Sequence, residues 1–320
     1  MSKIEWCDET WNVAVGCSRV STGCERCYAE RVAHRGLSES HRGLTVMGKT
    51  GPRWTGEVRF LPDRLAVPLG WKKPRRVFVN SMSDLFHPAL THEQRAAVFG
   101  VVAACPQHTF QVLTKRDPRP FFAWVMDGTG PMTSPTDVVL DAASDVTAIS
   151  RVRRTTYPWP LPNLELLVSV EDQKSADERI PWLFGCDAAI RGVSYEPALD
   201  PVDFSRWLSL GSPCSAGSPC ATCEGGGEAC DRLDVIIVGG ESGPGARPFD
   251  VHIARETIAQ CRAAEVACFI KQMGAHPVDV VADESGGFGF TVAALDLADA
   301  KGGDMSEWPE GLDVREWPTP

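Results

Sequence analysis

Short apolar runs recur along the chain, and each one ends in polar residues. They lie at residues 11–15, 76–81, 109–113, 164–168, 188–193, 233–238 and 266–270. Nearly continuous apolar runs of this length are typical of strands that are covered on both faces, as in a parallel sheet. The pattern therefore predicts an α/β fold, with residues 11–15 as the first strand.

Helix signals stand between several of these runs. Residues 28–35 predict a first helix, and the motif Thr91-His92-Glu93-Gln94 is a capping box ahead of an apolar segment. The motif Ser175-Ala176-Asp177-Glu178 predicts a second capping box, and Asp250 is expected to cap a later helix. Alternating strands and helices indicate βαβ units with right-handed crossovers.

Polar residues that follow the predicted strands are the first candidates for a site. In such folds, ligands bind at the carboxyl ends of the strands. We expect these residues to line one shared polar cavity, although each one taken alone could be a surface loop or a helix cap. They are Ser81, Asp84, Thr114, Lys115, Ser169, Glu171, Ser194, Glu196, Glu241, Ser242, Lys271 and Gln272.

Three cysteines follow the first predicted strand, as Cys17-x6-Cys24-x2-Cys27. A structural zinc site closes all four of its ligand positions, and no fourth ligand is obvious here. A [4Fe–4S] cluster held by three thiolates has one iron open for chemistry. The spacing therefore predicts a metal site with one open position, and a [4Fe–4S] cluster is one group that would fit it.

A second cysteine set lies within a glycine-rich insertion at residues 211–231. Its members are Cys214, Cys220, Cys223 and Cys230. A loop too short to have its own core, with four thiols, predicts a zinc knuckle. A second iron–sulfur cluster and a loop without metal are the alternatives. Residues 128–163, rich in Gly, Pro, Ser and Thr, are expected to form another excursion from the fold or a lid.

The turn from Gly239 to Pro248 is a further local signal. Its glycines, Gly239 and Gly240 among them, let backbone amides approach an anion closely, and Arg247 could grip a carboxylate or phosphate. A tight turn without a ligand is the alternative. His87 could act as a ligand or as an acid or base, but a structural histidine is the preferred interpretation.

Composition limits the classes of function. Of the 320 residues, 43% are hydrophobic, no apolar run is long enough to span a membrane, and the first residues lack a signal peptide. A cytoplasmic location without a membrane partner is therefore predicted. The net charge of −10 argues against nucleic-acid binding by the whole surface, yet basic residues gather between Arg31 and Arg76, with Trp54 and Trp71 among them. A solvated face is the preferred interpretation of this region, and contact with a nucleic acid is the alternative.

Several sequence blocks spread over almost the whole chain carry a resemblance to a known family. They are Trp11-Asn12 with the cysteine loop and Tyr28-Ala29-Glu30, Ser83-Asp84-Leu85-Phe86-His87, Leu113-Thr114-Lys115-Arg116, Val168-Ser169-Val170-Glu171, Glu196-Pro197, residues 239–248 and Phe269-Ile270-Lys271-Gln272. On these blocks the chain resembles a phage-associated three-cysteine-motif family of proteins of unestablished function. That family is in turn similar to radical S-adenosylmethionine (SAM) enzymes, whose usual motif has three residues in the first gap where this chain has six.

The resemblance implies a fold, an activity and roles for these residues. The fold would be a partial (βα)6 TIM-like barrel of radical SAM type at residues 1–278, with the cysteine-rich insertion inside it and a C-terminal tail at 279–320. Cys17, Cys24 and Cys27 would hold a [4Fe–4S] cluster whose fourth iron binds SAM. An electron donor would then drive formation of a 5′-deoxyadenosyl radical, which attacks a small molecule, a nucleotide or a nucleic-acid base.

The same resemblance assigns cofactor-binding and catalytic residues. The candidates for binding the cofactor are Ser81, Asp84, Ser169, Ser194, Gly239, Gly240, Glu241, Ser242, Arg247 and Lys271. The candidates for catalysis are Glu171, Glu196 and Lys115. Two other functions stay open. One is a non-enzymatic zinc-containing phage protein that binds nucleic acid, and the other is a hydrolytic metalloenzyme that uses the carboxylates.

Overall fold

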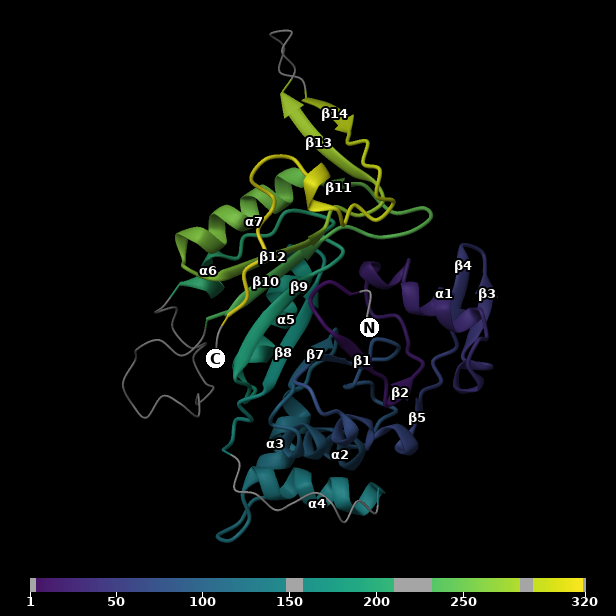
Figure 1. The fold of residues 1–320 in the computed structure, drawn as a ribbon, viewed down its shortest axis with the longest axis vertical. Helices are drawn as coiled ribbons and strands as arrows, with labels where there is room; N and C mark the ends of the chain where they lie inside the picture. The colour runs from purple at the N-terminus through teal and green to yellow at the C-terminus, as the bar shows by residue number, and fades with distance from the viewer. Residues whose placement is uncertain (1–3, 148–157, 210–231, 283–289, 319–320) are drawn as a thin grey trace. The chain divides into compact units, whose positions relative to one another are not determined.

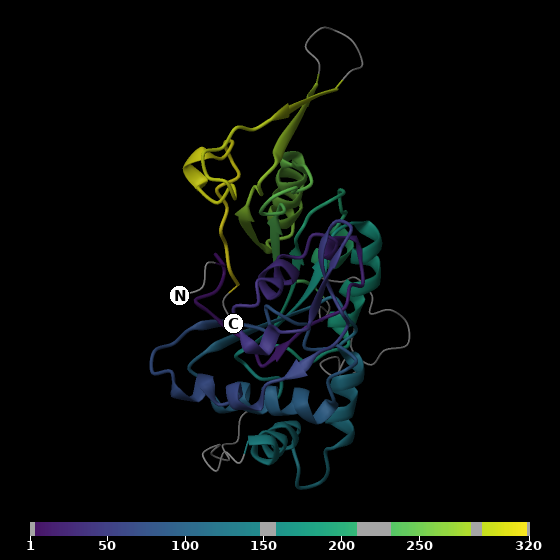
Figure 2. The ribbon, with the colours of Figure 1, turned by 90° about the vertical axis from the view of Figure 1, so that its right-hand side faces the viewer.

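A computed structural model describes residues 4–147, 158–209, 232–282 and 290–318 (Figures 1 and 2). The chain forms two compact units. Unit 1 comprises Met1–Val168 and Gly185–Ile190, and unit 2 comprises Ser169–Phe184 and Arg191–Thr319. The four cysteines at 214–230 lie outside the described residues, so the zinc knuckle stays a prediction.

The main sheet has seven strands in the order β1-β6-β7-β8-β9-β10-β12. Neighbours whose register is defined pair in parallel. This confirms the predicted α/β class. The strands follow one another in chain order without a reversal, as in a barrel and unlike a doubly wound sheet. Seven strands are present where a (βα)6 barrel has six. They are β1 Glu9–Trp11, β6 Arg76–Val79, β7 Thr109–Thr114, β8 Leu164–Val170, β9 Ile190–Tyr195, β10 Val235–Gly239 and β12 Ala267–Gln272.

Helices α2 (His92–Ala104), α3 (Arg119–Asp127) and α4 (Pro135–Thr147) gather against one another in unit 1. The predicted capping box of α2 is confirmed, since Thr91 and Gln94 exchange both hydrogen bonds. α4 lies in the segment expected to be an excursion and packs on α2. A side chain at Gly100 would overlap the carbonyl oxygen of Val139, so glycine is required where these two helices cross.

The first strand was predicted at residues 11–15, which is wrong, because the first strand of the main sheet lies earlier in the chain and shares only Trp11 with that range. β1 ends at Trp11, and Ala14–Val15 form β2, which pairs with β5 (Arg59–Phe60). The backbone amides of Val13 and Ala14 donate to the Asn80 side chain, at 3.0 and 3.1 Å, so they are lost to the main sheet. A strand prediction that counted apolar residues alone could not see this competing acceptor.

A helix and a hairpin complete unit 1. α1 (Tyr28–His34) confirms the helix predicted at 28–35, and it packs against the β3–β4 hairpin, Thr45–Gly48 and Gly51–Trp54 (Figure 1). Their shared core holds Val15, Ala29, Ala33, Leu44 and Met82. The short 3-10 helices are η1 Thr22–Cys24, η2 Glu39–His41, η3 Pro62–Arg64 and η4 Val67–Gly70.

In unit 2, α7 (Val251–Ala263) packs on β10 and β12. Asp250 caps α7 as predicted, accepting from His252 N at 2.9 Å. α5 (Gln173–Phe184) begins two residues before the predicted capping box, which is therefore wrong. Asp172 takes the capping role instead and accepts from Ser175 N at 2.7 Å. The remaining elements are α6 Ser205–Leu208, β11 Phe249–Asp250, β13 Pro277–Ala282, β14 Phe290–Ala294 and η5 Met305–Glu307.

The C-terminal segment packs within unit 2. The Trp317 ring contacts Phe269 of β12, and the Arg315 guanidinium lies over the rings of Phe269 and Trp308. The boundary predicted at residue 278 stays a prediction. Within the described residues, no helix is long and apolar enough to cross a membrane.

Candidate functional site

Two asparagines fix the point where the cysteine loop leaves the sheet. Asn80, which follows β6, accepts from the amides of Val13 and Ala14, and it adopts a positive φ of 60°. Asn12, which follows β1, accepts from Ser81 Oγ at 3.1 Å and from Met82 N at 3.0 Å. The predicted cofactor residue Ser81 therefore uses its hydroxyl to brace two loops. Sequence reasoning missed both asparagines, although each directly follows a strand.

Gly16 sets the path of the chain immediately before Cys17. Its φ of 93° is in the left-handed region, and a side chain there would overlap the carbonyl oxygen of Glu57. Its amide donates to Met82 O at 3.0 Å, and its carbonyl accepts from Ser83 Oγ at 2.6 Å. Cys17 thus starts from a backbone position that only glycine can hold without strain.

The three predicted cysteine ligands carry no disulfide and are all partly exposed. Cys24 ends η1, and Cys27 is the residue before α1. Burial raises the pKa of Cys17 to about 12 and raises that of Cys27, and the charge of Cys24 adds to both shifts. Because the thiolate is the metal-binding form, a bound cation is needed to favour it here.

The structure does not bring the three cysteines together as ligands of one metal ion. In the part of the chain that the structure describes, no three His, Cys, Asp or Glu side chains are grouped so that they could hold one. The iron–sulfur site therefore stays a prediction.

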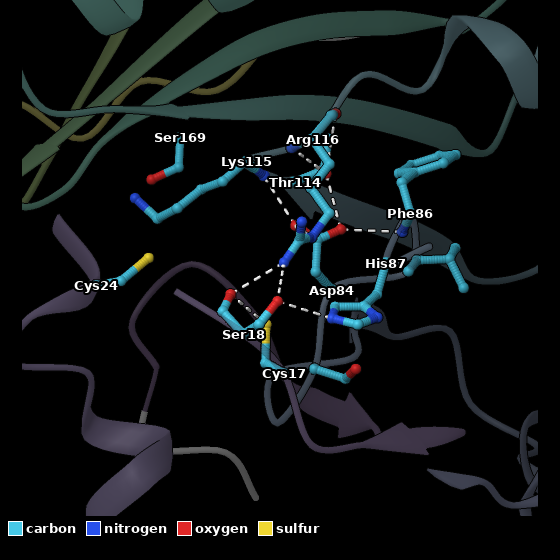
Figure 3. Close-up of polar contacts among 12 residues, drawn as sticks. Cys17, Ser18, Cys24, Asp84, Phe86, His87, Thr114, Lys115, Arg116 and Ser169 are labelled. Carbon is cyan, nitrogen blue, oxygen red and sulfur yellow. Dashed lines mark hydrogen bonds and ion pairs between the residues drawn. The ribbon is translucent and has the colours of Figure 1, made fainter. Parts of the chain in front are cut away.

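Asp84 joins the loop after β6 to the end of β7. Its Oδ1 accepts from Phe86 N at 2.9 Å and from Thr114 Oγ1 at 2.8 Å, and its Oδ2 accepts from Lys115 N at 3.0 Å (Figure 3). The carboxylate is only 7% exposed. Asp84 therefore accepts three hydrogen bonds from the chain itself. This residue was predicted to bind the cofactor, but in the structure its contacts hold two loops together.

Arg116 links this carboxylate to the cysteine loop. Its Nε lies 3.9 Å from Asp84 Oδ2, and its Nη2 donates to both Ser18 O and Ser18 Oγ at 2.9 Å (Figure 3). The same guanidinium lowers the pKa of Cys17, against the larger effect of burial. Neither Arg116 nor Ser18 was among the predicted site residues. The sequence signal was present, since Arg116 lies two residues beyond a strand-ending threonine.

Ser18 and His87 face each other, but their hydrogen bonds rule out a nucleophilic serine. Ser18 Oγ lies 3.0 Å from His87 Nε2, and Ala89 N donates to His87 Nδ1 at 3.2 Å. Since Nδ1 accepts, the neutral ring carries its proton on Nε2 and donates it to Ser18. Burial, with the charge of Arg116, lowers the pKa of His87 to about 4. A base that already holds the proton cannot activate Ser18, which favours the structural interpretation of His87.

A second cluster lies in unit 2 and joins four strand ends. Glu196 accepts from Ser194 Oγ at 3.1 Å and forms an ion pair with Lys271 at 2.8 Å, and Ser169 Oγ donates to Glu196 O at 3.3 Å. A side chain at Gly239 would lie 2.8 Å from Glu196 Oε1. The structure therefore brings together five of the predicted residues, one from each of β8, β10 and β12 and two from the β9 end.

The glycine-rich turn after β10 closes on itself. Glu241 accepts from the Arg247 amide at 2.8 Å and from Arg247 Nε at 3.1 Å, and it also contacts Nη2. A side chain at Gly240 would lie 2.6 Å from Met273 O, so the backbones approach closely there. Arg247, predicted to grip a ligand carboxylate, holds a protein carboxylate instead. Ser242 is partly exposed on the same turn.

Glu171 is a buried structural carboxylate in this structure. It has no exposed surface and forms an ion pair with Arg179 at 3.0 Å. Arg179 also donates to Ser169 O at 2.7 Å. A charge buried in such a pair is costly to separate, so the geometry does not favour the predicted catalytic role. Lys115 was also predicted to be catalytic, as was Glu196. Its backbone amide donates to the Asp84 carboxylate.

Comparison with known proteins gives one match. A family model described as "Protein of unknown function (DUF5131)" matches residues 1–296. No curated protein and no solved structure matches the chain.

Proposed function

This chain belongs to the DUF5131 family, and we propose that it is an iron–sulfur enzyme of the radical SAM type. One observation carries the proposal. Three cysteines that are not in disulfides share one loop, and a glycine that no other residue can replace without strain sets the path of the chain into that loop, beside the end of β6. A [4Fe–4S] cluster bound there would supply one electron for reductive cleavage of SAM and hydrogen abstraction from a substrate.

The chain's own residues have definite tasks in this proposal. Cys17, Cys24 and Cys27 bind three irons. Arg116 offsets the negative charge of the thiolates and fixes the backbone at Ser18, directly after the first ligand. Asp84 orients Arg116 and ties the loop after β6 to β7. His87 stays neutral above pH 4, so it adds no charge beside the site.

Metal analysis tests the proposal directly. The full chain is reconstituted anaerobically with iron and sulfide, and we expect about four irons per site with the broad absorption of a cluster. The triple variant Cys17→Ser/Cys24→Ser/Cys27→Ser should lose this iron. The control is Cys105→Ala, which removes a buried cysteine directly after α2 in the same unit, and this variant should retain the iron.

An assay for SAM cleavage with a chemical reductant completes the test. The reconstituted protein should release 5′-deoxyadenosine, and the triple variant should not. Binding of zinc with no iron, or unchanged iron in the triple variant, would overturn the proposal. The first result would favour the zinc-containing nucleic-acid-binding protein instead.

A further inference from the structure

We propose that the exposed face of α1 and the segment after it, residues 28–37, bind single-stranded nucleic acid. We name this face the α1 surface. It begins at the cysteine loop, so the bound strand would be the substrate of that site. The assignment as substrate rests on the proposed function, whereas binding itself does not.

Charge is strongly segregated along the chain. Residues 26–76 carry twelve Lys and Arg against four Asp and Glu, a formal charge of +8, while the whole chain carries −10. The rest of the chain therefore carries −18. A basic region within an acidic protein attracts a polyanion at one place and repels it elsewhere.

The α1 surface combines basic and apolar side chains at helical spacing. Tyr28, Arg31, Val32 and Arg35 follow the i, i+3, i+4, i+7 pattern of one helix face, opposite the buried Ala29 and Ala33. Tyr28 is 45% exposed and Val32 37% exposed. Leu37, just beyond the helix, is 86% exposed.

Exposed apolar residues concentrate in this part of the molecule. Of the eleven large hydrophobic side chains exposed among the described residues, six lie between residues 20 and 47. They are Val20, Tyr28, Val32, Leu37, Val46 and Met47. The β3–β4 hairpin packs against α1 (Figure 1). It adds Arg53, which is exposed and is the register partner of Val46.

This mixture favours a single strand over a duplex or a protein. Phosphates of any nucleic acid would be held by the arginines, but a duplex hides its base faces. Unpaired bases can stack on Tyr28 and cover Val32 and Leu37. An acidic protein would match the charge but would not use an exposed aromatic ring beside arginines as a stacking platform.

The α1 surface is joined to the site by covalent and hydrogen-bonded links. Cys27 directly precedes α1, and Tyr28 OH donates to Ser81 O at 2.7 Å. Ser81 Oγ in turn donates to Asn12, which fixes the start of the cysteine loop. A strand that stacks on Tyr28 therefore has a base next to the loop that holds the three thiols.

Fluorescence anisotropy with the full-length protein tests the proposal. The probes are labelled 20-nucleotide DNA and RNA strands and the matching duplexes, measured over a series of salt concentrations. The variant Arg31→Gln/Arg35→Gln removes two charges from the α1 surface. The control Lys174→Gln/Lys301→Gln removes two exposed charges from unit 2.

We expect single strands to bind more tightly than duplexes. The α1 variant should bind at least about tenfold more weakly at low salt, and its salt slope should fall by about 1.4, which is two single-strand phosphate contacts. The control should change neither value. If the double variant does not fold, Arg35→Gln alone, on an exposed side chain past the helix, should show about half of the slope change.

Several outcomes would overturn the proposal: no binding of either strand, equal binding of duplex, or equal weakening by the control. A preference between DNA and RNA identifies which strand is bound. The triple cysteine variant separates the two proposals, since it should lose SAM cleavage and still bind the strand. SAM cleavage without strand binding would refute only the α1 surface.

Discussion

Asp84 of unit 1 and the pair Glu196–Lys271 of unit 2 show two ways of holding a carboxylate near the end of a strand. Asp84 accepts from two backbone amides, which cannot move without the main chain, and from one threonine hydroxyl. Glu196 pairs instead with Lys271, whose side chain is long and rotatable. A fixed scaffold suits the holding of a metal loop, and exchangeable pairs suit the admission of a ligand.

The largest effect should come from Asp84→Ala. It leaves three donors without an acceptor in a buried position, and each such loss costs about 1–3 kcal/mol. We expect the free energy of unfolding to fall by about 4 kcal/mol, measured by urea denaturation with tryptophan fluorescence. The control Asp117→Ala removes a partly exposed carboxylate that contacts Arg119, and it should change stability by less than about 1 kcal/mol. Similar losses in both variants would show that Asp84 is no scaffold.

The pH dependence of the free energy of unfolding tests whether the pKa of His87, the histidine that contacts Ser18, is lowered in the folded chain. Its pKa in the folded chain is about 4, against an ordinary 6.5. As the pH falls, His87 therefore takes up its proton in the unfolded chain before it does so in the folded chain. The free energy of unfolding consequently decreases as the pH falls from 6.5 to about 4. The loss should reach up to about 3 kcal/mol relative to His87→Gln.

Nuclear magnetic resonance of the ring protons measures the same pKa directly. The signal absent from His87→Gln identifies the residue. A titration midpoint near 6.5 would mean that neither burial nor Arg116 disfavours the charged ring, and the predicted loss of stability between pH 6.5 and 4 would then be absent.

Backbone placement of the cysteine loop is tested by Gly16→Ala. The left-handed φ alone costs about 1 kcal/mol, and overlap with Glu57 O adds to it. We expect a loss of about 2 kcal/mol or more, together with lower iron content. The control is Gly36→Ala, which shares a positive φ of 64° but has open space around it. Equal effects in the two variants would mean that the loop can shift away from Glu57.

The repeated strand pattern was sufficient to predict the α/β class, the parallel sheet and the polar ends of its strands. It could not predict which polar ends bind one another. Asn80 captures two amides that the apolar pattern assigned to a strand, and Arg179 neutralises Glu171 from a helix eight residues away. Such partners depend on tertiary placement, which spacing along one chain does not encode. Ser18 was missed for the same reason, whereas Arg116 follows the end of β7 closely enough to have been included.

The smallest effect should come from the ion pair of unit 2. Lys271 and Glu196 side chains are 18% and 13% exposed, so solvent screens them in part. A double-mutant cycle with Lys271→Met and Glu196→Gln should give a coupling energy of about 1 kcal/mol. A value above about 3 kcal/mol would mean that this pair is as fixed as Asp84, and the contrast between the units would fail. A small coupling leaves both side chains able to exchange partners, as a residue that receives a ligand must.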